Sequence, residues 1–201
     1  MVDVMEQVKD FLVRNKTEFA ILKISHIRSD RGKDGDIKNQ LQEFLNHYEE
    51  HFYCSTDEKV LLHELPIGQL RGKMLMVFDY NEHIDPSRGR FRYHDAGDIS
   101  NATQPNIGVF DKYANKGSYK DMRSDQLEKW TKQSSHLGKG GLFLLSWTLT
   151  GDIVETLAAE ANKHLLEELR TNVPRLGKPN IIYIDFLDKA LTSSIIGFNF
   201  Q

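Results

Sequence analysis

This sequence has a single cysteine, Cys54, so no disulfide can form within the chain. It also has no large excess of charge, because 26 lysines and arginines face 29 aspartates and glutamates, for a net charge of −3. A balance this close argues against the broad basic field of nucleic-acid-binding proteins. One free thiol leaves the redox compartment open.

Long hydrophobic runs are absent as well. No stretch approaches the roughly 20 apolar residues that a transmembrane helix needs. Residues 1–7 have neither the basic nor the apolar region of a signal peptide, so we expect a soluble chain of unknown localisation. With 39% hydrophobic residues in 201, the chain can build a real core, and we predict one domain over residues 1–201.

Hydrophobic periodicity predicts an alternation of amphipathic helices and buried strands. The expected helices cover residues 2–15, 37–52, 124–134, 152–170 and 187 onward. The expected strands cover residues 17–25, 74–78, 107–110, 142–147 and 178–185. Apart from the strand at 107–110, residues 79–120 are predicted to form a long polar loop, of a kind that is usually functional or disordered.

This alternation is typical of a parallel α/β fold. An open dinucleotide-binding sheet should carry a glycine fingerprint after its first strand, and Gly32 and Gly35 do not form one. A closed strand–helix barrel needs eight strands and about 250 residues, for which this chain is short. The residues alone leave both arrangements open.

The strand at 178–185 ends in a carboxylate, Asp185. Ligands of strand–helix folds bind at the carboxyl ends of the strands, which makes Asp185 a functional candidate. The structural alternative is that Asp185 caps the helix expected from Leu187. Position in the sequence does not decide between the two.

Other groupings of reactive residues fit known sites poorly. His47 and His51 stand four residues apart, as zinc ligands on a helix do, but Tyr48 occupies the place of the metalloprotease glutamate. Ser146 lacks the glycine neighbours of a nucleophile elbow. Four loop acids match no EF-hand spacing: Asp79, Asp85, Asp95 and Asp98. We therefore predict a solvated helix face for the histidines, and no metal or cofactor.

Four short segments, in order along nearly the whole chain, resemble the X-domain type of phosphatidylinositol-specific phospholipase C. The first, similar to the family pattern "FL…NP.ETI", comprises Val8-Lys9-Asp10-Phe11-Leu12, Asn15, Glu18 and Ile21, with Lys16 in place of the usual proline. The second, Leu70-Arg71-Gly72-Lys73, is similar to the lead-in "RGKI". The last two, similar to the strands "QDKY" and "QDY", are Phe110-Asp111-Lys112-Tyr113 and Ile184-Asp185-Phe186.

The resemblance implies a partial (β/α) TIM-like barrel of about five parallel strands with helices on the outside, equivalent to the C-terminal part of the family's barrel. The family cleaves phosphodiesters at lipid headgroups, with one histidine as general base and another as general acid. An arginine stabilises the phosphate charge. These three residues belong to the family's first strand–helix units, which this sequence lacks, so we expect the isolated chain to be inactive.

The resemblance also implies roles for individual residues. Asp185 matches the acid that orients the base histidine. Asp111 and Tyr113 match positions that line the active site, the acid toward the headgroup and the ring toward the sugar. Asp79 stands where bacterial inositol-specific enzymes carry a headgroup-binding arginine, which puts phosphatidylinositol itself in doubt as the substrate. His26, which follows the first strand, is either a substrate contact or an ordinary loop histidine.

Two classes of function remain. One is part of a phospholipase C-like phosphodiesterase, whose partners would be a phospholipid headgroup or membrane surface and a separate N-terminal half. The other is a non-catalytic fragment, or a module that binds lipid headgroups or proteins. A barrel cut open in this way would expose strand edges near residues 19–25 and 180–185, through which the chain could self-associate.

Overall fold

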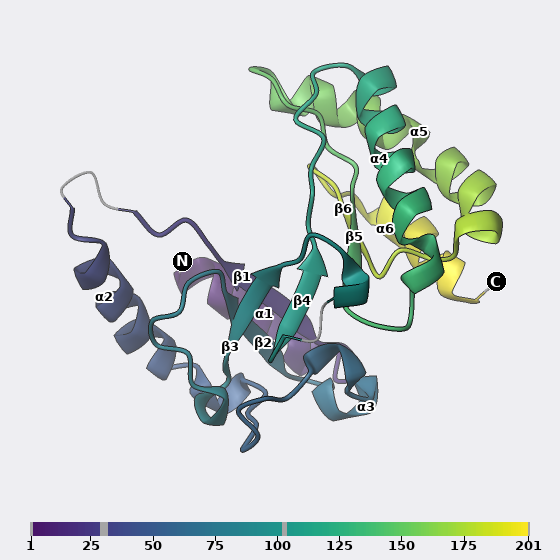
Figure 1. Ribbon diagram of the computed structural model, residues 1–201. Coiled ribbons are helices and arrows are strands. Elements are labelled where there is room, and N and C mark those ends of the chain that lie inside the picture. Colours follow the sequence, from purple (N-terminus) through teal and green to yellow (C-terminus); the bar gives the residue numbers. More distant parts are fainter. Residues whose placement is uncertain (1, 29–31, 102–103, 201) are drawn as a thin grey trace. The chain divides into compact units, whose positions relative to one another are not determined.

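The computed structural model describes residues 2–28, 32–101 and 104–200 (Figure 1). The chain forms two compact units. The first unit comprises residues 1–95 and 103–108, and the second comprises residues 96–102 and 109–201. Each unit is described by itself below.

The first unit alternates helices with parallel strands. Its α-helices and strands are α1 (Val2–Arg14), β1 (Ala20–Ile24), α2 (Asp34–Asn46), α3 (Ile67–Leu70), β2 (Met74–Phe78) and β3 (Arg90–Asp95). Its 3-10 helices are η1 (Glu49–His51), η2 (Leu62–Glu64) and η3 (Pro86–Arg88). Strand β2 pairs in parallel with β1 on one side and with β3 on the other. Parallel neighbours place the carboxyl ends of these strands at one edge.

The second unit repeats the pattern. Its α-helices and strands are β4 (Ile107–Phe110, which begins in the first unit), α4 (Tyr119–Gln133), β5 (Leu142–Ser146), α5 (Val154–Leu176), β6 (Ile181–Tyr183) and α6 (Lys189–Gly197). Its 3-10 helices are η4 (Ile99–Asn101), η5 (Ser134–His136) and η6 (Phe198–Phe200). Strand β5 pairs in parallel with β4 and with β6.

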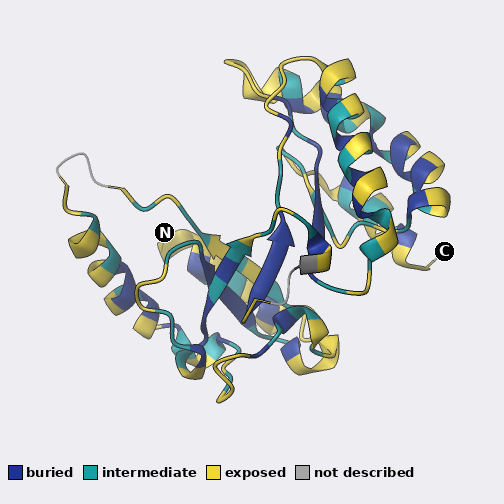
Figure 2. Ribbon diagram, in the orientation of Figure 1, coloured by how far each residue is buried: buried dark blue, intermediate teal, exposed yellow. Residues whose placement is uncertain are grey.

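Each unit buries one face of its strands under helices. In the first unit, Met76 and Phe78 of β2 pack in one apolar cluster with Leu12 of α1 and Leu45 of α2. Every residue of β2 is buried, as Figure 2 shows in dark blue for β4 as well. In the second unit, the alternate residues Phe143, Leu145 and Trp147 form the core with α4 and α5. This alternation is what a strand covered by helices requires.

Both tryptophans belong to the core of the second unit. Trp130 and Trp147 are fully buried, and each indole N–H finds a backbone acceptor. Trp130 Nε1 donates to Gly177 O at 3.2 Å, and Trp147 Nε1 donates to Ala161 O at 2.9 Å. A buried indole that keeps its hydrogen bond contributes its large apolar surface without a desolvation penalty.

Six strands are present where about five were expected, because β3 lies inside the segment predicted as a long loop. Its sequence alternates two buried aromatic residues, Phe91 and Tyr93, with arginines. The charged residues made this segment resemble a polar loop rather than a strand. Arg90 is almost fully buried and donates to Asn46 Oδ1. Arg92 Nη1 donates to Phe78 O at 2.9 Å. The arginines are thus part of the packing rather than loop residues.

The prediction that the second helix extends to residue 52 was wrong. Helix α2 stops at Asn46, and His47 is its C-cap, with Nδ1 3.1 Å from Glu43 O. His51 belongs to the separate 3-10 helix η1. The two histidines therefore do not share one continuous helix face. None of the helices in the described part of the chain is long and apolar enough to cross a membrane.

Strand β1 has β2 as its ladder partner, and β6 has β5. No second ladder partner is found for either strand among the described residues. These are the two strands whose edges were expected to be exposed. Self-association through them stays a prediction.

Gly89 fixes the entry into β3 and can be tested against a matched glycine. It has a φ of 73°, and a Cβ there would lie 2.6 Å from Phe52 Cβ and 2.6 Å from Tyr53 O. Gly72 has a φ of 71° with nothing within 4 Å of the same position. Both alanine variants carry the left-handed strain of about 1–2 kcal/mol. We expect Gly89→Ala to lose about 1–3 kcal/mol more than Gly72→Ala in urea unfolding, because it also overpacks. Equal losses would contradict the packing role of Gly89.

Candidate functional site

In the first unit, two predicted site residues meet at the carboxyl ends of neighbouring strands. His26 follows β1, and Asp79 follows β2. The backbone N–H of His26 donates to Asp79 Oδ2 at 3.3 Å, and His26 Nδ1 lies 3.9 Å from the same oxygen. Asp79 N donates in turn to Ile24 O at 3.3 Å. The carboxylate therefore joins the two strand ends and leaves the imidazole largely exposed.

The backbone at His26 is strained, with a φ of 55°. A non-glycine residue in this region is uncommon, and such residues cluster at functional sites. The bond from the His26 N–H to Asp79 helps to hold this conformation. The pair can position an imidazole beside a carboxylate, which is the arrangement of a base and its orienting acid.

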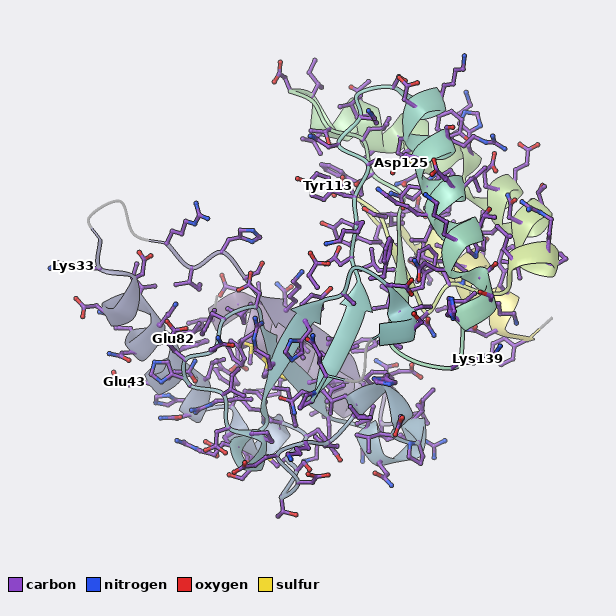
Figure 3. The ribbon with its side chains drawn as sticks, in the orientation of Figure 1. Lys33, Glu43, Glu82, Tyr113, Asp125 and Lys139 are labelled. Atoms are coloured by element: carbon purple, nitrogen blue, oxygen red, sulfur yellow. The ribbon has the colours of Figure 1, made fainter. Side chains whose placement is uncertain are left out.

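The loop that follows Asp79 is held to the rest of the first unit by a hydrogen bond, an ion pair and a cation–π contact. Arg92 Nε donates to Asn81 Oδ1 at 2.8 Å. Lys38 of α2 pairs with Glu82, Nζ to Oε1 2.9 Å, and lies 4.5 Å from the ring centroid of Tyr80. Glu82 is labelled in Figure 3 beside α2. These contacts hold in place the loop that begins with Asp79.

In the second unit, α4 holds the segment Asp111–Tyr113 through its backbone. Gln126 is fully buried, its Nε2 donates to Lys112 O at 2.9 Å, and its Oε1 accepts from Ser146 N at 3.0 Å. Lys129 Nζ donates to Lys112 O at 3.1 Å and to Tyr113 O at 3.0 Å. One helix therefore connects the end of β5 to the segment after β4.

The contacts from α4 use backbone oxygens of this segment rather than its side chains. The Tyr113 ring is 62% exposed, whereas Asp111 is half-buried. Figure 3 shows Tyr113 projecting away from α4, on which Asp125 lies. Phe110, the last residue of β4, packs into the core under the helices, and Asp111 follows it directly. An acid and an exposed ring thus stand together at the end of β4.

Asp185 lies two residues beyond β6, at the same edge of the second unit, with β5 between it and Asp111. Its carbonyl oxygen accepts from Asn162 Nδ2 of α5 at 2.8 Å. The helix cap is a different residue, because Asp188 Oδ1 accepts from Leu191 N at 2.8 Å at the start of α6. The interpretation of Asp185 as a helix cap was therefore wrong, and its carboxylate is not used by α6.

Sequence reasoning missed the residues that position these groups. Gln126, Lys129 and Asn162 are polar residues on amphipathic helices, where a solvated side chain is the ordinary expectation. The complete burial of Gln126 gives no signal in the sequence. Within the described residues, no cluster of three or more histidine, cysteine, aspartate or glutamate side chains could hold a metal ion.

No protein-family model matches this chain, and no curated protein matches it. Among solved structures it is similar to the phosphatidylinositol-specific phospholipase C from Listeria monocytogenes, with a TM-score of 0.69 and 19% sequence identity. The similarity covers 96% of this chain and 68% of that chain. At this identity the similarity concerns the fold. The predicted α/β fold, a partial TIM-like barrel like that of phosphatidylinositol-specific phospholipase C, is confirmed.

Helix α4, which carries Gln126, is bound to α5 by a cluster that should respond to alkaline pH. Tyr119 OH donates to Glu168 Oε1 at 3.3 Å, and Arg123 Nη2 donates to Glu168 Oε2 at 3.0 Å. Burial and the nearby charge of Glu168 raise the pKa of Tyr119 to about 12, from an ordinary 10.0. A raised folded-state pKa contributes stability that is present below the unfolded pKa and is lost as pH rises through the folded one.

We therefore expect the wild-type protein to lose stability between about pH 10 and 12 more steeply than Tyr119→Phe, which cannot ionise there. Urea unfolding at stepped pH measures this difference. Tyr113→Phe is the control, because the Tyr113 ring is mostly exposed. Parallel curves for wild type and Tyr119→Phe would contradict the role of Tyr119.

The assignment of the two aspartates near β6 gives a second prediction. Asp188→Ala removes the side-chain cap of α6 and should cost about 1 kcal/mol of unfolding free energy. Asp185→Ala removes a carboxylate that α6 does not use, and should cost less than about 0.5 kcal/mol. If Asp185→Ala costs as much as Asp188→Ala in urea unfolding, Asp185 has a structural role instead.

Proposed function

We propose that this chain is the substrate-binding part of a phospholipase C-type phosphoric diester hydrolase that acts on phospholipid headgroups, of phosphatidylinositol or a related lipid. The observation that carries the proposal is the similarity in fold, over 96% of the chain, to a phosphatidylinositol-specific phospholipase C. It is supported by acids and an exposed tyrosine at the ends of strands, where ligands of such folds bind.

Each candidate residue has a distinct role in this proposal. The Asp185 carboxylate, which the helix cap does not use, would orient the base histidine. Asp111 would accept hydrogen bonds from headgroup hydroxyls, and the exposed Tyr113 ring would pack against the sugar. His26 and Asp79 would contact substrate in the first unit. The acid at Asp79 disfavours a headgroup that relies on an arginine there.

The chemistry requires one group to deprotonate the attacking hydroxyl and another to protonate the leaving oxygen. Among the described histidines, His26 is the one that pairs with an acid at the end of a neighbouring strand. A single imidazole can serve as the general base or as the general acid, but the reaction needs both groups. We therefore expect the isolated chain to bind headgroups and to cleave none. This also supports the second candidate, a non-catalytic headgroup-binding module.

Two measurements on the purified chain test the proposal. The first incubates it with vesicles of phosphatidylinositol or phosphatidylcholine and follows released phosphorylated headgroup by ³¹P NMR; we expect no release above buffer. The second titrates ¹⁵N-labelled chain with myo-inositol 1-phosphate or glycerophosphocholine, and we expect amide shifts at Asp111–Tyr113 and near Asp185. Tyr113→Ala should weaken binding about tenfold, and Lys132→Ala, an exposed change on α4, should not.

Turnover that Asp185→Asn abolishes would show that the isolated chain is catalytic. That outcome would contradict the expected inactivity and support the hydrolase. Binding without turnover is the expected result. Neither turnover nor headgroup binding, in a chain that unfolds cooperatively, would overturn the proposed function altogether.

A further inference from the structure

Three neighbouring side chains of the first unit carry four buried polar atoms that have no hydrogen-bond partner within the described residues. These atoms are Nε2 and Oε1 of Gln42, the hydroxyl oxygen of Tyr80 and Nε of Arg90. Gln42 is 7% exposed and Arg90 is 5% exposed, so both residues are more than nine-tenths buried. Buried polar groups are nearly always hydrogen-bonded, because an unpartnered group has lost its bonds to water and gained none in return. Four such atoms in one place point to a bound partner.

One face of α2 brings the three side chains together. Lys38, Gln42 and Asn46 are spaced four residues apart, so they follow one another along the same face of the helix. Lys38 Nζ lies 4.5 Å from the ring centroid of Tyr80, and Asn46 Oδ1 accepts from Arg90 Nη2. Gln42 stands between these two contacts, and its amide is close enough to the Tyr80 hydroxyl to act on the pKa of that group. We call Gln42, Tyr80 and Arg90 the donor cluster.

The donor cluster lies against apolar side chains. The rings of Phe78 and Tyr80 pack edge to face, with their centroids 5.4 Å apart. Leu45 of α2 is fully buried in the same apolar cluster as Phe78. Burial raises the pKa of Tyr80 to about 12, from an ordinary 10.0, so the phenol keeps its proton at neutral pH and remains a donor. Hydrogen bonds and ionic contacts in such surroundings are stronger than in water.

The charge of Arg90 is only partly balanced by its neighbours. Glu49 makes its short bonds to Arg88, with Nη2 to Oε2 at 2.6 Å and Nε to Oε1 at 2.9 Å. Arg90 Nη2 lies farther from the same carboxylate, 3.8 Å from Oε2. Burial, and next the charge of Arg88, lower the pKa of Arg90 in spite of the attraction from Glu49 and Asp85. An arginine stays charged in a protein, so this guanidinium still needs a countercharge.

The chemistry of the unpartnered atoms selects the ligand. Arg90 Nε, the Tyr80 hydroxyl and Gln42 Nε2 are donors. The guanidinium would repel a cation. Water could accept these hydrogen bonds, but a neutral molecule leaves the buried charge as it is. A small anion accepts from the donors and supplies the missing charge.

We propose that the donor cluster binds a small monovalent anion, of the size of chloride, between α2 and the start of β3. Arg90 Nε, the Tyr80 hydroxyl and Gln42 Nε2 donate to it. The anion completes the ionic pairing of Arg90 and joins α2 to the residues that follow β2. None of the three residues is a candidate for headgroup binding, so this inference and the proposed function can fail separately.

Urea unfolding of the purified chain at constant ionic strength, with chloride replacing the larger anion gluconate, tests the proposal. An ion that binds only the folded state lowers the unfolding equilibrium constant in proportion to its concentration, once that concentration exceeds Kd. We expect a decrease of about tenfold for each tenfold rise in chloride in that range. The ³⁵Cl NMR signal should also broaden when the protein is added, and bromide should reverse the broadening.

Variants of the donor cluster locate the ion. Gln42→Leu removes a donor at similar volume and should weaken chloride binding at least about tenfold, because a hydrogen bond to a charged group is lost. Tyr80→Phe keeps the ring and should weaken binding in the same way. The matched control is Gln40→Leu, an exposed change on the same helix, which should keep the chloride dependence of the wild type. Cooperative unfolding in gluconate confirms that each variant folds.

Three results would overturn the anion site. Equal unfolding curves in chloride and gluconate, without broadening of the ³⁵Cl signal, would assign the donor cluster to buried water. An unchanged chloride dependence in both Gln42→Leu and Tyr80→Phe would place the ion elsewhere on the protein. An equal loss in Gln40→Leu and Gln42→Leu would do the same. A loss confined to Gln42→Leu and Tyr80→Phe is the expected result.

Discussion

The second unit depends on one buried amide, the side chain of Gln126. Its oxygen accepts from Ser146 N at the end of β5, and its nitrogen donates to Lys112 O just past β4. Both backbone groups lie beyond the β4–β5 ladder, whose last pair is Phe110 and Phe143, so pairing between these two strands does not satisfy them. A buried backbone group without a partner costs about 1–3 kcal/mol. The amide therefore fixes where β4 and β5 stop relative to each other, and the position of Asp111 follows from this.

Gln126 can do this because its helix is itself fixed. Glu168, buried on α5, accepts from Arg123 and from Tyr119, so α4 is joined to α5 by a charged contact as well as by apolar packing. Lys129 then adds a second pair of hydrogen bonds to the carbonyls of Lys112 and Tyr113. In the first unit a side chain also binds the backbone at a strand end, but as an acceptor, since the Asp79 carboxylate accepts from the backbone N–H of His26. In both units a side chain supplies the hydrogen bonds that the ladder no longer supplies.

The sequence predicted the parts of the fold that follow from apolar runs. The strand Met74–Phe78 is buried throughout, as its five apolar residues require. It did not predict β3, because the residues Arg90 and Arg92 resemble a polar loop until their partners Asn46 and the Phe78 carbonyl are known. The site shows the same limit. Asp185 and Asp188 stand three residues apart, and either fits a helix cap; only the backbone bond to Leu191 N separates the cap from the free acid.

The separation of these roles bears on function. A carboxylate that caps a helix is held by the backbone N–H groups it accepts from, and a ligand would compete with the fold for it. Asp188 is the residue that caps α6 in this way. Because α6 does not depend on Asp185, the Asp185 carboxylate can change partners without unfolding α6. Tyr113 shows the same division of roles. Gln126 and Lys129 bind the backbone oxygens of Lys112 and Tyr113, and the Tyr113 ring takes no part in these bonds. Hydrogen bonds to backbone groups thus stabilise this edge, and the Tyr113 ring stays exposed. That arrangement suits recognition of a ligand at this edge of the second unit.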